Sequence, residues 1–208
     1  LPLKSVHGIP PKVNILANHP SGGQLHFKTN SKRILVRVKL AAGKPGQHMT
    51  QMGRAGFDLY TGEPTKQVFR GSTRFPFDAK NYIASLTYNA ARDMLNCTLN
   101  FPLYNGVESV EIGLDETAKI EAPIELSDSK PIVIYGTSIT QGGCATRPGM
   151  NFPNILSRRL NQEIVNLGFS GSGKGEPAMA HIISEIPNKK LTILDMECNT
   201  HESLRKVL

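Results

Sequence analysis

The 208-residue sequence has no tryptophan, only three cysteines and no apolar run that approaches 18 residues. The short apolar runs exclude a helix that spans a membrane. Without tryptophan, the chain lacks the large aromatic side chain that stacks well on sugar rings, which weakens an interpretation as a carbohydrate-binding protein. The cysteines form neither a Cys-x-x-Cys pair nor a zinc-ligand spacing, and they allow at most one internal disulfide. They are Cys97, Cys144 and Cys198.

Basic residues outnumber acidic ones, and the formal net charge is +7. The basic residues are scattered, because the densest runs, Lys32-Arg33 and Arg158-Arg159, are only pairs. Nucleic-acid binding needs a clustered basic footprint, so we interpret the excess charge as a solvated surface and expect no nucleic-acid partner. The chain opens on Leu1 rather than methionine, which indicates a processed or trimmed product. We expect a secreted or periplasmic location.

The first part of the chain, residues 1–125, is predicted to be all-β. Apolar side chains at Val36, Val38 and Leu40 alternate with Arg37 and Lys39, a pattern typical of a half-buried strand. No helical periodicity of useful length is present. Several short strands separated by Gly, Pro and Asn turns predict a β-sandwich of the jelly-roll kind. The further strand-like runs are 68–69, 82–88, 97–101 and 109–114.

A polar linker at 126–130 separates this part from residues 131–208, where the pattern changes. The continuous apolar run at 131–135 predicts a strand buried on both faces. Two further strands, 164–167 and 191–194, alternate with helical patterns at 152–160 and 177–186. The order β-α-β-α-β predicts a parallel sheet with right-handed crossovers, in a three-layer α/β/α unit of the flavodoxin-like kind. Residues 201–208 are predicted to open a third helix.

Unusual residues follow each of the three predicted parallel strands. They lie in the segments 136–140, 168–173 and 195–199. Sites in an open parallel sheet form beyond the carboxyl ends of the strands. A serine hydroxyl, a glycine turn with free N–H groups and an asparagine amide would therefore meet at one edge. These are the groups that acyl transfer to a serine requires.

At these residues the sequence resembles the SGNH (GDSL-like) hydrolases. Ser138, in Gly-Thr-Ser-Ile-Thr, matches the nucleophile of the first family block. Gly171 and Asn199 match the oxyanion-hole residues of the second and third blocks. Two upstream segments, Gly-Phe-Asp-Leu-Tyr at 56–60 and Asn-Phe-Pro-Leu-Tyr-Asn-Gly at 100–106, resemble a branch with a β-rich N-terminal domain.

The resemblance implies a serine esterase that uses no metal or other cofactor. Its implied substrates are short acyl esters, such as acetyl esters, of a carbohydrate or a small alcohol. Thr137 stands where the better-known motif has Asp, and Thr200 follows Asn199 where Asp is common. The acid and base of the family come from an Asp-x-x-His segment, and no Asp in this sequence has His three residues on. We therefore expect the chain to be C-terminally incomplete, with a missing segment or a partner chain completing the sheet.

Simpler interpretations and two rival functions remain open. Ser138 could only cap a helix, Gly171 could be a turn glycine, and Asn199 could be a turn residue or cap. His201 could be the base, but a solvent-facing position in a first helical turn is the simpler interpretation. Segment 168–174 is similar to a phosphate-binding P-loop, although Gly175 stands where a P-loop needs Ser or Thr. A non-catalytic carbohydrate-binding protein is the other alternative. Cys144 and Cys198 could pair or stay free.

Overall fold

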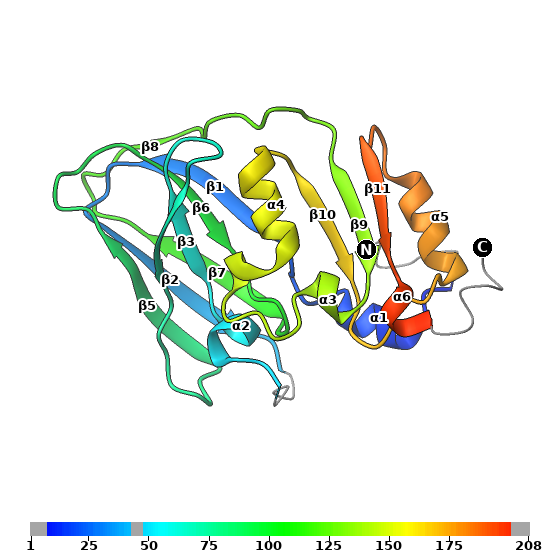
Figure 1. Cartoon of the computed structure of the whole chain (residues 1–208). Helices are drawn as coiled ribbons and strands as arrows, with labels where there is room; N and C mark the ends of the chain where they lie inside the picture. Colours follow the sequence, from blue (N-terminus) through cyan, green and yellow to red (C-terminus); the bar gives the residue numbers. More distant parts are fainter. Residues whose placement is uncertain (1–7, 43–47, 201–208) are drawn as a thin grey trace.

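The computed structural model describes residues 8–42 and 48–200, which form a mixed α/β fold as the sequence predicts (Figure 1). Two antiparallel sheets occupy the first part of the chain. The five-stranded sheet has the order β4-β3-β6-β1-β8, and the three-stranded sheet has the order β5-β2-β7. The strands are β1 (Gln24–Thr29), β2 (Arg33–Leu40), β3 (Asp58–Thr61), β4 (Val68–Ser72), β5 (Asn81–Tyr88), β6 (Leu95–Asn100), β7 (Val107–Gly113) and β8 (Ile120–Glu121).

The two antiparallel sheets share one apolar core, and β2 contributes to it as its alternating sequence predicts. Val36 and Val38 are buried in this core, whereas Arg37 and Lys39 point to solvent. The core also includes Leu59 from β3 and residues of β5 and β6. Strands β1, β3 and β8 were not predicted. β3 is short and buried along its whole length, and β1 is half-buried nearly throughout, so neither shows the alternation that marked β2.

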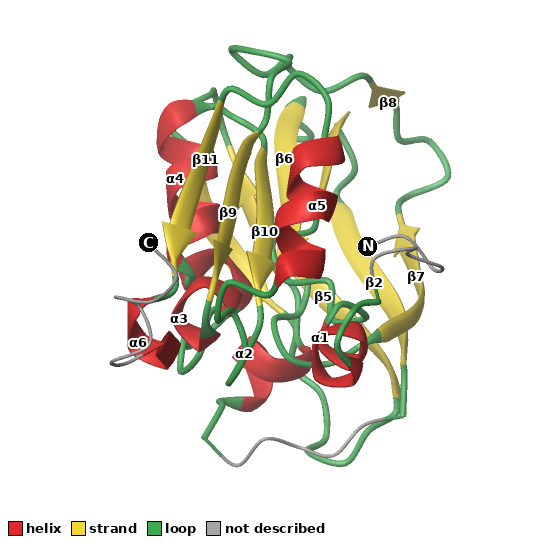
Figure 2. Cartoon of the chain, turned by 90° about the vertical axis from the view of Figure 1, so that its right-hand side faces the viewer, coloured by secondary structure: helices red, strands yellow, loops and turns green. Residues whose placement is uncertain are grey.

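Residues 132–195 form the predicted parallel sheet, in the order β10-β9-β11. Its strands are β9 (Ile132–Gly136), β10 (Ile164–Gly168) and β11 (Leu191–Asp195), and both pairings are parallel. Helix α4 (Phe152–Leu160) packs on one face, and α5 (Pro177–Glu185) packs on the other (Figure 2). Short helices follow two of the strands: α3 (Ser138–Gln141) and α6 (Glu197–Thr200). A 3₁₀ turn, Pro148–Met150, precedes α4. The helix predicted at 201–208 lies outside the described residues.

Two short helices in the first part of the chain were not predicted. They are α1 (Pro11–Leu16) and α2 (Gln51–Ala55), which span 6 and 5 residues and are too short to display a helical period. Helix α1 packs with α5 on the same face of the parallel sheet, where Val13 is fully buried against Val133 and Tyr135. Helix α1 thus belongs structurally with the unit that begins at 131. Within the described ranges, no helix combines the length and apolar character needed to cross a membrane.

Candidate active site

The register of the parallel sheet brings three strand ends together. Gly136, Gly168 and Asp195 are aligned neighbours at the carboxyl ends of β9, β10 and β11. Gly136 has no space for a side chain, because a Cβ there would collide with Thr140 Oγ1 and Asp195. The Thr140 hydroxyl donates to Asp195 Oδ2 at 2.6 Å, which ties the first strand end to the third. The three polar segments predicted from the sequence therefore lie at one edge.

Ser138 is the first residue of α3, directly after this edge. The residue that caps the helix is Thr137, whose Oγ1 accepts from the N–H of Ile139 at 3.3 Å. Thr137 thereby caps the helix, as the Asp that the better-known motif has at this position could also do. Ser138 is half-buried, and neither its hydroxyl nor its N–H forms a hydrogen bond with any described residue. Ser138 is consequently not the cap of this helix, and both its polar groups are available to a ligand.

Gly171 lies in the loop after β10, in a left-handed conformation with φ of +66°. Its N–H has no hydrogen-bond acceptor within the described part of the chain, while its carbonyl accepts from Lys12 Nζ at 3.3 Å. Gly173, at φ of +72°, lies against the end of β9, where a Cβ would collide with the Gly136 carbonyl. Because only glycine tolerates this conformation and this close approach together, the loop can lie directly over the start of α3.

Asn199 belongs to α6, which follows β11. Its side-chain Nδ2 donates to the carbonyl of Ser172, the residue after Gly171. This hydrogen bond joins Asn199, the third predicted site residue, to the loop that carries Gly171, the second. The convergence of the Ser138 N–H, the Gly171 N–H and the Asn199 amide on a single point stays a prediction. His201 lies outside the described residues.

Asp58 is a buried carboxylate that sequence reasoning quoted within a signature without giving it a role. It is 0% exposed and accepts hydrogen bonds at 2.8 Å from Asn100 Nδ2 and from the Gly149 N–H. Arg147 Nε lies 3.4 Å from its second oxygen. Burial raises the pKa of Asp58, and the two hydrogen bonds and the Arg147 charge act in the opposite direction. The available signal was a charged residue between the apolar neighbours Phe57 and Leu59.

The rest of this signature holds the same segment between α3 and α4. The Tyr60 hydroxyl accepts from Arg147 Nη2 at 3.1 Å, and the Arg158 guanidinium lies 3.9 Å from the centre of the Tyr60 ring. Arg158 also donates to the Gly149 carbonyl at 2.7 Å. The Gly-x-Asp-Leu-Tyr segment is therefore the surface on which the residues after the candidate nucleophile helix are anchored.

Comparison with known proteins covers both parts of the chain. Residues 1–120 match the family model for the N-terminus of SGNH-hydrolase-type esterases, and residues 129–206 match the GDSL-like lipase/acylhydrolase family. The chain belongs to the GDSL-like (SGNH) esterase family. The order of these two matches agrees with the order of the β-rich and α/β parts, as the resemblance of the motifs predicted.

Two solved structures place this GDSL-like chain beside longer relatives. A protein from Bacteroides ovatus ATCC 8483, described as a GDSL-like lipase, is 30% identical with a TM-score of 0.82, over 96% of this chain and 61% of its own. The salicylyl-acyltransferase SsfX3 from a tetracycline biosynthetic pathway is 20% identical with a TM-score of 0.64, over 89% of this chain and 50% of its own, and shows the fold alone. The chain thus spans less than two thirds of either relative. No curated protein matches it.

The P-loop interpretation of segment 168–174 does not fit the hydrogen bonds of this GDSL-like site. The Tyr135 hydroxyl accepts from the N–H groups of Gly175 and Glu176 at 3.1 and 3.3 Å and itself donates to the Glu176 carboxylate. The Lys174 N–H donates to the same carboxylate at 2.9 Å. Burial, followed by the bond to Glu176, raises the pKa of Tyr135. The Glu176 carboxylate and the Tyr135 hydroxyl therefore already accept from the N–H groups of residues 174–176, at the end of the loop where a phosphate would bind.

The three cysteines are unpaired. Cys144 and Cys198 are free and exposed, and the pairing left open by the sequence is not formed. Cys97 is buried in the antiparallel core, where burial raises the pKa of its thiol to about 12. Such a thiol stays protonated and packs as a small apolar side chain. Within the described ranges, no three His, Cys, Asp or Glu side chains are grouped closely enough to hold a metal ion.

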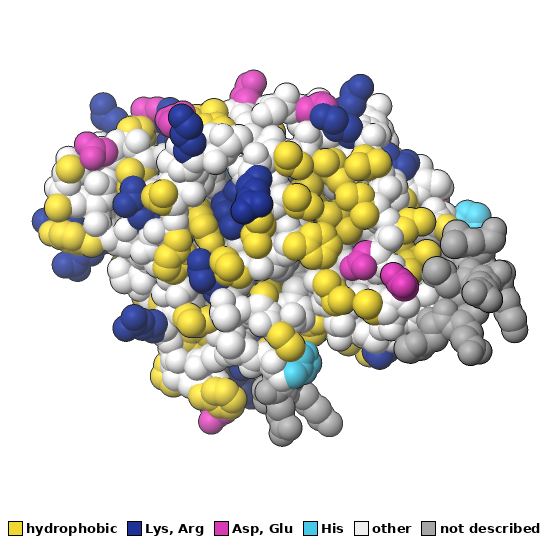
Figure 3. Space-filling view, viewed as in Figure 1, with side chains coloured by type: hydrophobic (Ala, Val, Ile, Leu, Met, Phe, Trp, Pro, Cys, Tyr) yellow, Lys and Arg dark blue, Asp and Glu magenta, His cyan; other side chains and the backbone are white. Residues whose placement is uncertain are grey.

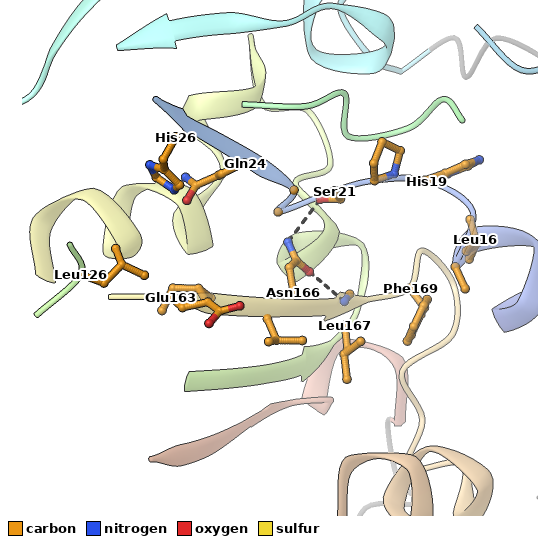
Figure 4. A pocket seen from close by; sticks show the side chains of 17 residues that line it. Leu16, His19, Ser21, Gln24, His26, Leu126, Glu163, Asn166, Leu167 and Phe169 are labelled. Carbon is orange, nitrogen blue, oxygen red and sulfur yellow. Dashed lines mark hydrogen bonds between the residues drawn. The ribbon is translucent and has the colours of Figure 1, made fainter. Parts of the chain in front are cut away.

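A cavity of about 530 Å³ lies away from these site residues, between residues 16–26 and strand β10 (Figure 4). Asn166 of β10 lies beside the cavity, where Nδ2 donates to Ser21 Oγ at 3.2 Å and Oδ1 accepts from the Gly168 N–H at 2.9 Å. His19 and His26 also line the cavity, and burial lowers the pKa of both. Ser138, Gly171 and Asn199 are not among its lining residues, so the cavity and the candidate active site are separate features.

Proposed function

We propose that the protein is a serine esterase in which Ser138 is the nucleophile. In this proposal the Ser138 N–H, the Gly171 N–H and the Asn199 side-chain amide stabilise the oxyanion. The substrates are short acyl esters, such as acetyl esters, of a carbohydrate or a small alcohol. The observation that carries the proposal is the unused hydroxyl of Ser138 at the meeting point of three strand ends in a GDSL-like chain.

The free N–H groups support the same proposal. Attack of Ser138 Oγ on the acyl carbon forms the acyl-serine bond and moves the carbonyl electrons onto oxygen. Donors that already point at this oxygen need no reorganisation when its charge develops. The N–H groups of Ser138 and Gly171 have no hydrogen-bond acceptor among the described residues, so a substrate oxygen would meet no protein competitor there.

The proton of the serine hydroxyl must pass to a base, which then protonates the departing alcohol. None of the histidines in the described ranges hydrogen-bonds to Ser138 Oγ. We propose that the base is a histidine of an Asp-x-x-His segment elsewhere in the complete protein, as the family resemblance implies. Water then attacks the acyl-serine carbonyl with help from the same base, which releases the acid and restores the serine.

We also propose that further chain, from the same polypeptide or a partner, completes the sheet beside β11. Leu191 and Leu194 of this edge strand are 51% and 57% exposed. Hydrophobic side chains gather beside α4 over the parallel sheet (Figure 3). Phe152 and Leu156 of α4 and Ile193 of β11 are half-buried and pack together with buried isoleucines of β9 and β10. An open apolar edge of this kind favours strand pairing, which supports a covered edge in the complete protein.

The finer architecture and the location belong to the same proposal. We propose a jelly-roll-like β-sandwich within residues 1–125, joined by the linker 126–130 to a flavodoxin-like hydrolase unit on which α1 packs. The shared core of the two antiparallel sheets supports the first unit, and helices on both faces of the parallel sheet support the second. A secreted or periplasmic location remains a prediction.

The test is hydrolysis of p-nitrophenyl acetate by the full-length protein. Ser138→Ala is expected to abolish the hydrolysis of p-nitrophenyl acetate, because no acyl-serine can form, without changing the unfolding midpoint. Ser184→Ala removes an exposed hydroxyl that bonds only within α5, and it serves as the matched control with full activity. An unchanged rate in Ser138→Ala would refute the nucleophile assignment. Glycan binding without any hydrolysis would favour the non-catalytic alternative.

A further inference from the structure

We propose that Tyr104 is a positioning residue that fixes the nucleophile turn against the oxyanion loop. This inference rests on the proposed esterase function and assigns a role to the Asn-Phe-Pro-Leu-Tyr-Asn-Gly segment at 100–106. Tyr104 comes from the β-rich part of the chain, after β6, and reaches across to the parallel sheet. It touches neither the acyl group nor the base in this proposal, and it acts through Ser138 and Ser170.

The phenol of Tyr104 bonds to the nucleophile turn and lies near the oxyanion loop. Its hydroxyl donates to the Ser138 carbonyl at 3.3 Å. Burial raises the pKa of Tyr104, and a hydrogen bond with the Ser170 side chain acts in the opposite direction. Ser170 directly precedes Gly171, the proposed oxyanion donor. The Tyr104 side chain, on a residue only 9% exposed, is therefore bonded to the residue that attacks and lies beside the loop that stabilises the developing charge.

Gln141 makes a second connection between the same three segments. Its side chain is 1% exposed, and Oε1 accepts from the Ser170 N–H at 2.8 Å. Its Nε2 donates to the Leu103 carbonyl, next to Tyr104, at 3.1 Å. Because α3 carries both Ser138 and Gln141, the two connections run side by side. A buried polar network with every partner present holds its members in one arrangement.

The space beside the phenol allows little alternative packing. A Cβ added to Gly143 would lie 3.1 Å from the Tyr104 hydroxyl and 3.5 Å from Ser138 Cβ. The phenol thus lies beside the nucleophile itself, with only a glycine between. Oxyanion donors act when they lie within hydrogen-bonding distance of the position that the charged oxygen will occupy, so small displacements reduce the rate. Loss of the Tyr104 hydroxyl should loosen this spacing without removing the aromatic ring.

The experiment compares Tyr104→Phe with Tyr82→Phe in the full-length protein. Tyr82 is the matched control, because its buried hydroxyl donates to the Ala55 carbonyl at 2.9 Å inside the antiparallel core. Tyr104→Phe is expected to lower kcat on p-nitrophenyl acetate about 10- to 100-fold, with KM within about twofold. Tyr82→Phe is expected to keep the wild-type kcat.

A double variant tests whether Tyr104 acts through the oxyanion loop. If it does, Tyr104→Phe combined with Ser170→Ala lowers kcat no further than Tyr104→Phe alone, because both changes remove the same connection. Independent effects that multiply would overturn this part. Equal losses of kcat in Tyr104→Phe and Tyr82→Phe would overturn the inference, since a general loss of stability would then explain both.

Amide hydrogen exchange gives a readout that does not depend on activity. Tyr104→Phe is expected to speed exchange in peptides covering 137–143 and 169–173, and Tyr82→Phe is expected to leave both unchanged. If the wild-type protein has no Ser138-dependent activity, the proposed function fails and the exchange result alone decides the role of Tyr104. Wild-type exchange together with a wild-type kcat in Tyr104→Phe would overturn the inference while leaving the esterase proposal intact.

Discussion

The carboxylate of Asp58 is buried away from solvent, and its partners come from both parts of the chain. Asn100 lies on the neighbouring strand β6, whereas Arg147 and Gly149 belong to the segment between α3 and α4. Burial of an ion pair costs solvation, which its mutual attraction offsets only when the geometry is good and the remaining hydrogen bonds are made. Removal of one partner is therefore more harmful than the modest net contribution of the intact pair.

Asp58→Asn is expected to lower the free energy of unfolding by about 3 kcal/mol, because it leaves the Arg147 charge partly buried without its counter-ion. Urea denaturation of the full-length protein measures this change. Asp78→Asn, at an exposed position, is the control and should fall within about 0.5 kcal/mol of the wild type. Equal effects of the two substitutions would show that the Asp58 cluster has no special role in stability.

The sequence identified some individual residues well and others poorly. Ser138 was proposed from its motif and its place after a strand, and the structure puts it at that strand end. Asn199 was recognised as well, but its hydrogen bond to Ser172 depends on a loop conformation that sequence patterns do not encode. The roles of Asp58, Gln141 and Tyr104 depend on contacts between residues far apart in the chain. Asp58 had one local signal, a charged residue between apolar neighbours, but no local pattern marked the roles of Gln141 and Tyr104.

Helices and strands were predicted where the apolar period was clear. Strands β2, β9, β10 and β11 and helices α4 and α5 have long apolar runs or strong periodicity and were found with small errors at their ends. Helices α1 and α2 are shorter than two helical turns, so contacts with the rest of the molecule, rather than local preference, determine them. The packing of α1 against the parallel sheet could not be predicted from the sequence either, because its partners lie more than 100 positions further along the chain.

Helix α1 supplies a matched pair for testing this packing. Val13→Ala is expected to lower the free energy of unfolding by about 2 kcal/mol, because it removes buried methyl groups and leaves a cavity against the sheet. Ile15→Ala changes a residue that is 65% exposed on the same helix and should have little effect. Chemical denaturation compares the two. A neutral Val13→Ala would mean that α1 contributes nothing to the stability of the sheet.

The exposed edge of β11 leads to an expectation for the molecule in solution. The 208-residue chain alone should associate or aggregate, because an unpaired apolar edge strand invites pairing with a second copy. Leu194→Lys should reduce this association by placing a charge on the edge, as natural edge strands do. Ile15→Lys changes a residue that is 65% exposed on helix α1, away from any strand edge, and is the control.

Light scattering after size-exclusion chromatography measures the association. A monodisperse monomer of wild-type sequence would contradict the expectation, as would equal behaviour of the two lysine variants. The same chain should also be a poor esterase if its base lies outside it. Turnover at ordinary enzyme rates by a sample ending at Leu208 would instead direct attention to His201.

The contact of α1 with the parallel sheet also has a consequence for synthesis on the ribosome. Lys12 bonds to the carbonyl of Gly171, 159 positions later in the chain. At roughly 5–20 residues per second, the growing polypeptide needs on the order of 10–30 s to make that distance. Val13 has no complete parallel sheet to cover it during this interval, although the antiparallel sheets have all their strands once residue 121 has been made. Helix α1 is thus made well before its native partners, and its apolar face is open to chaperones until they appear.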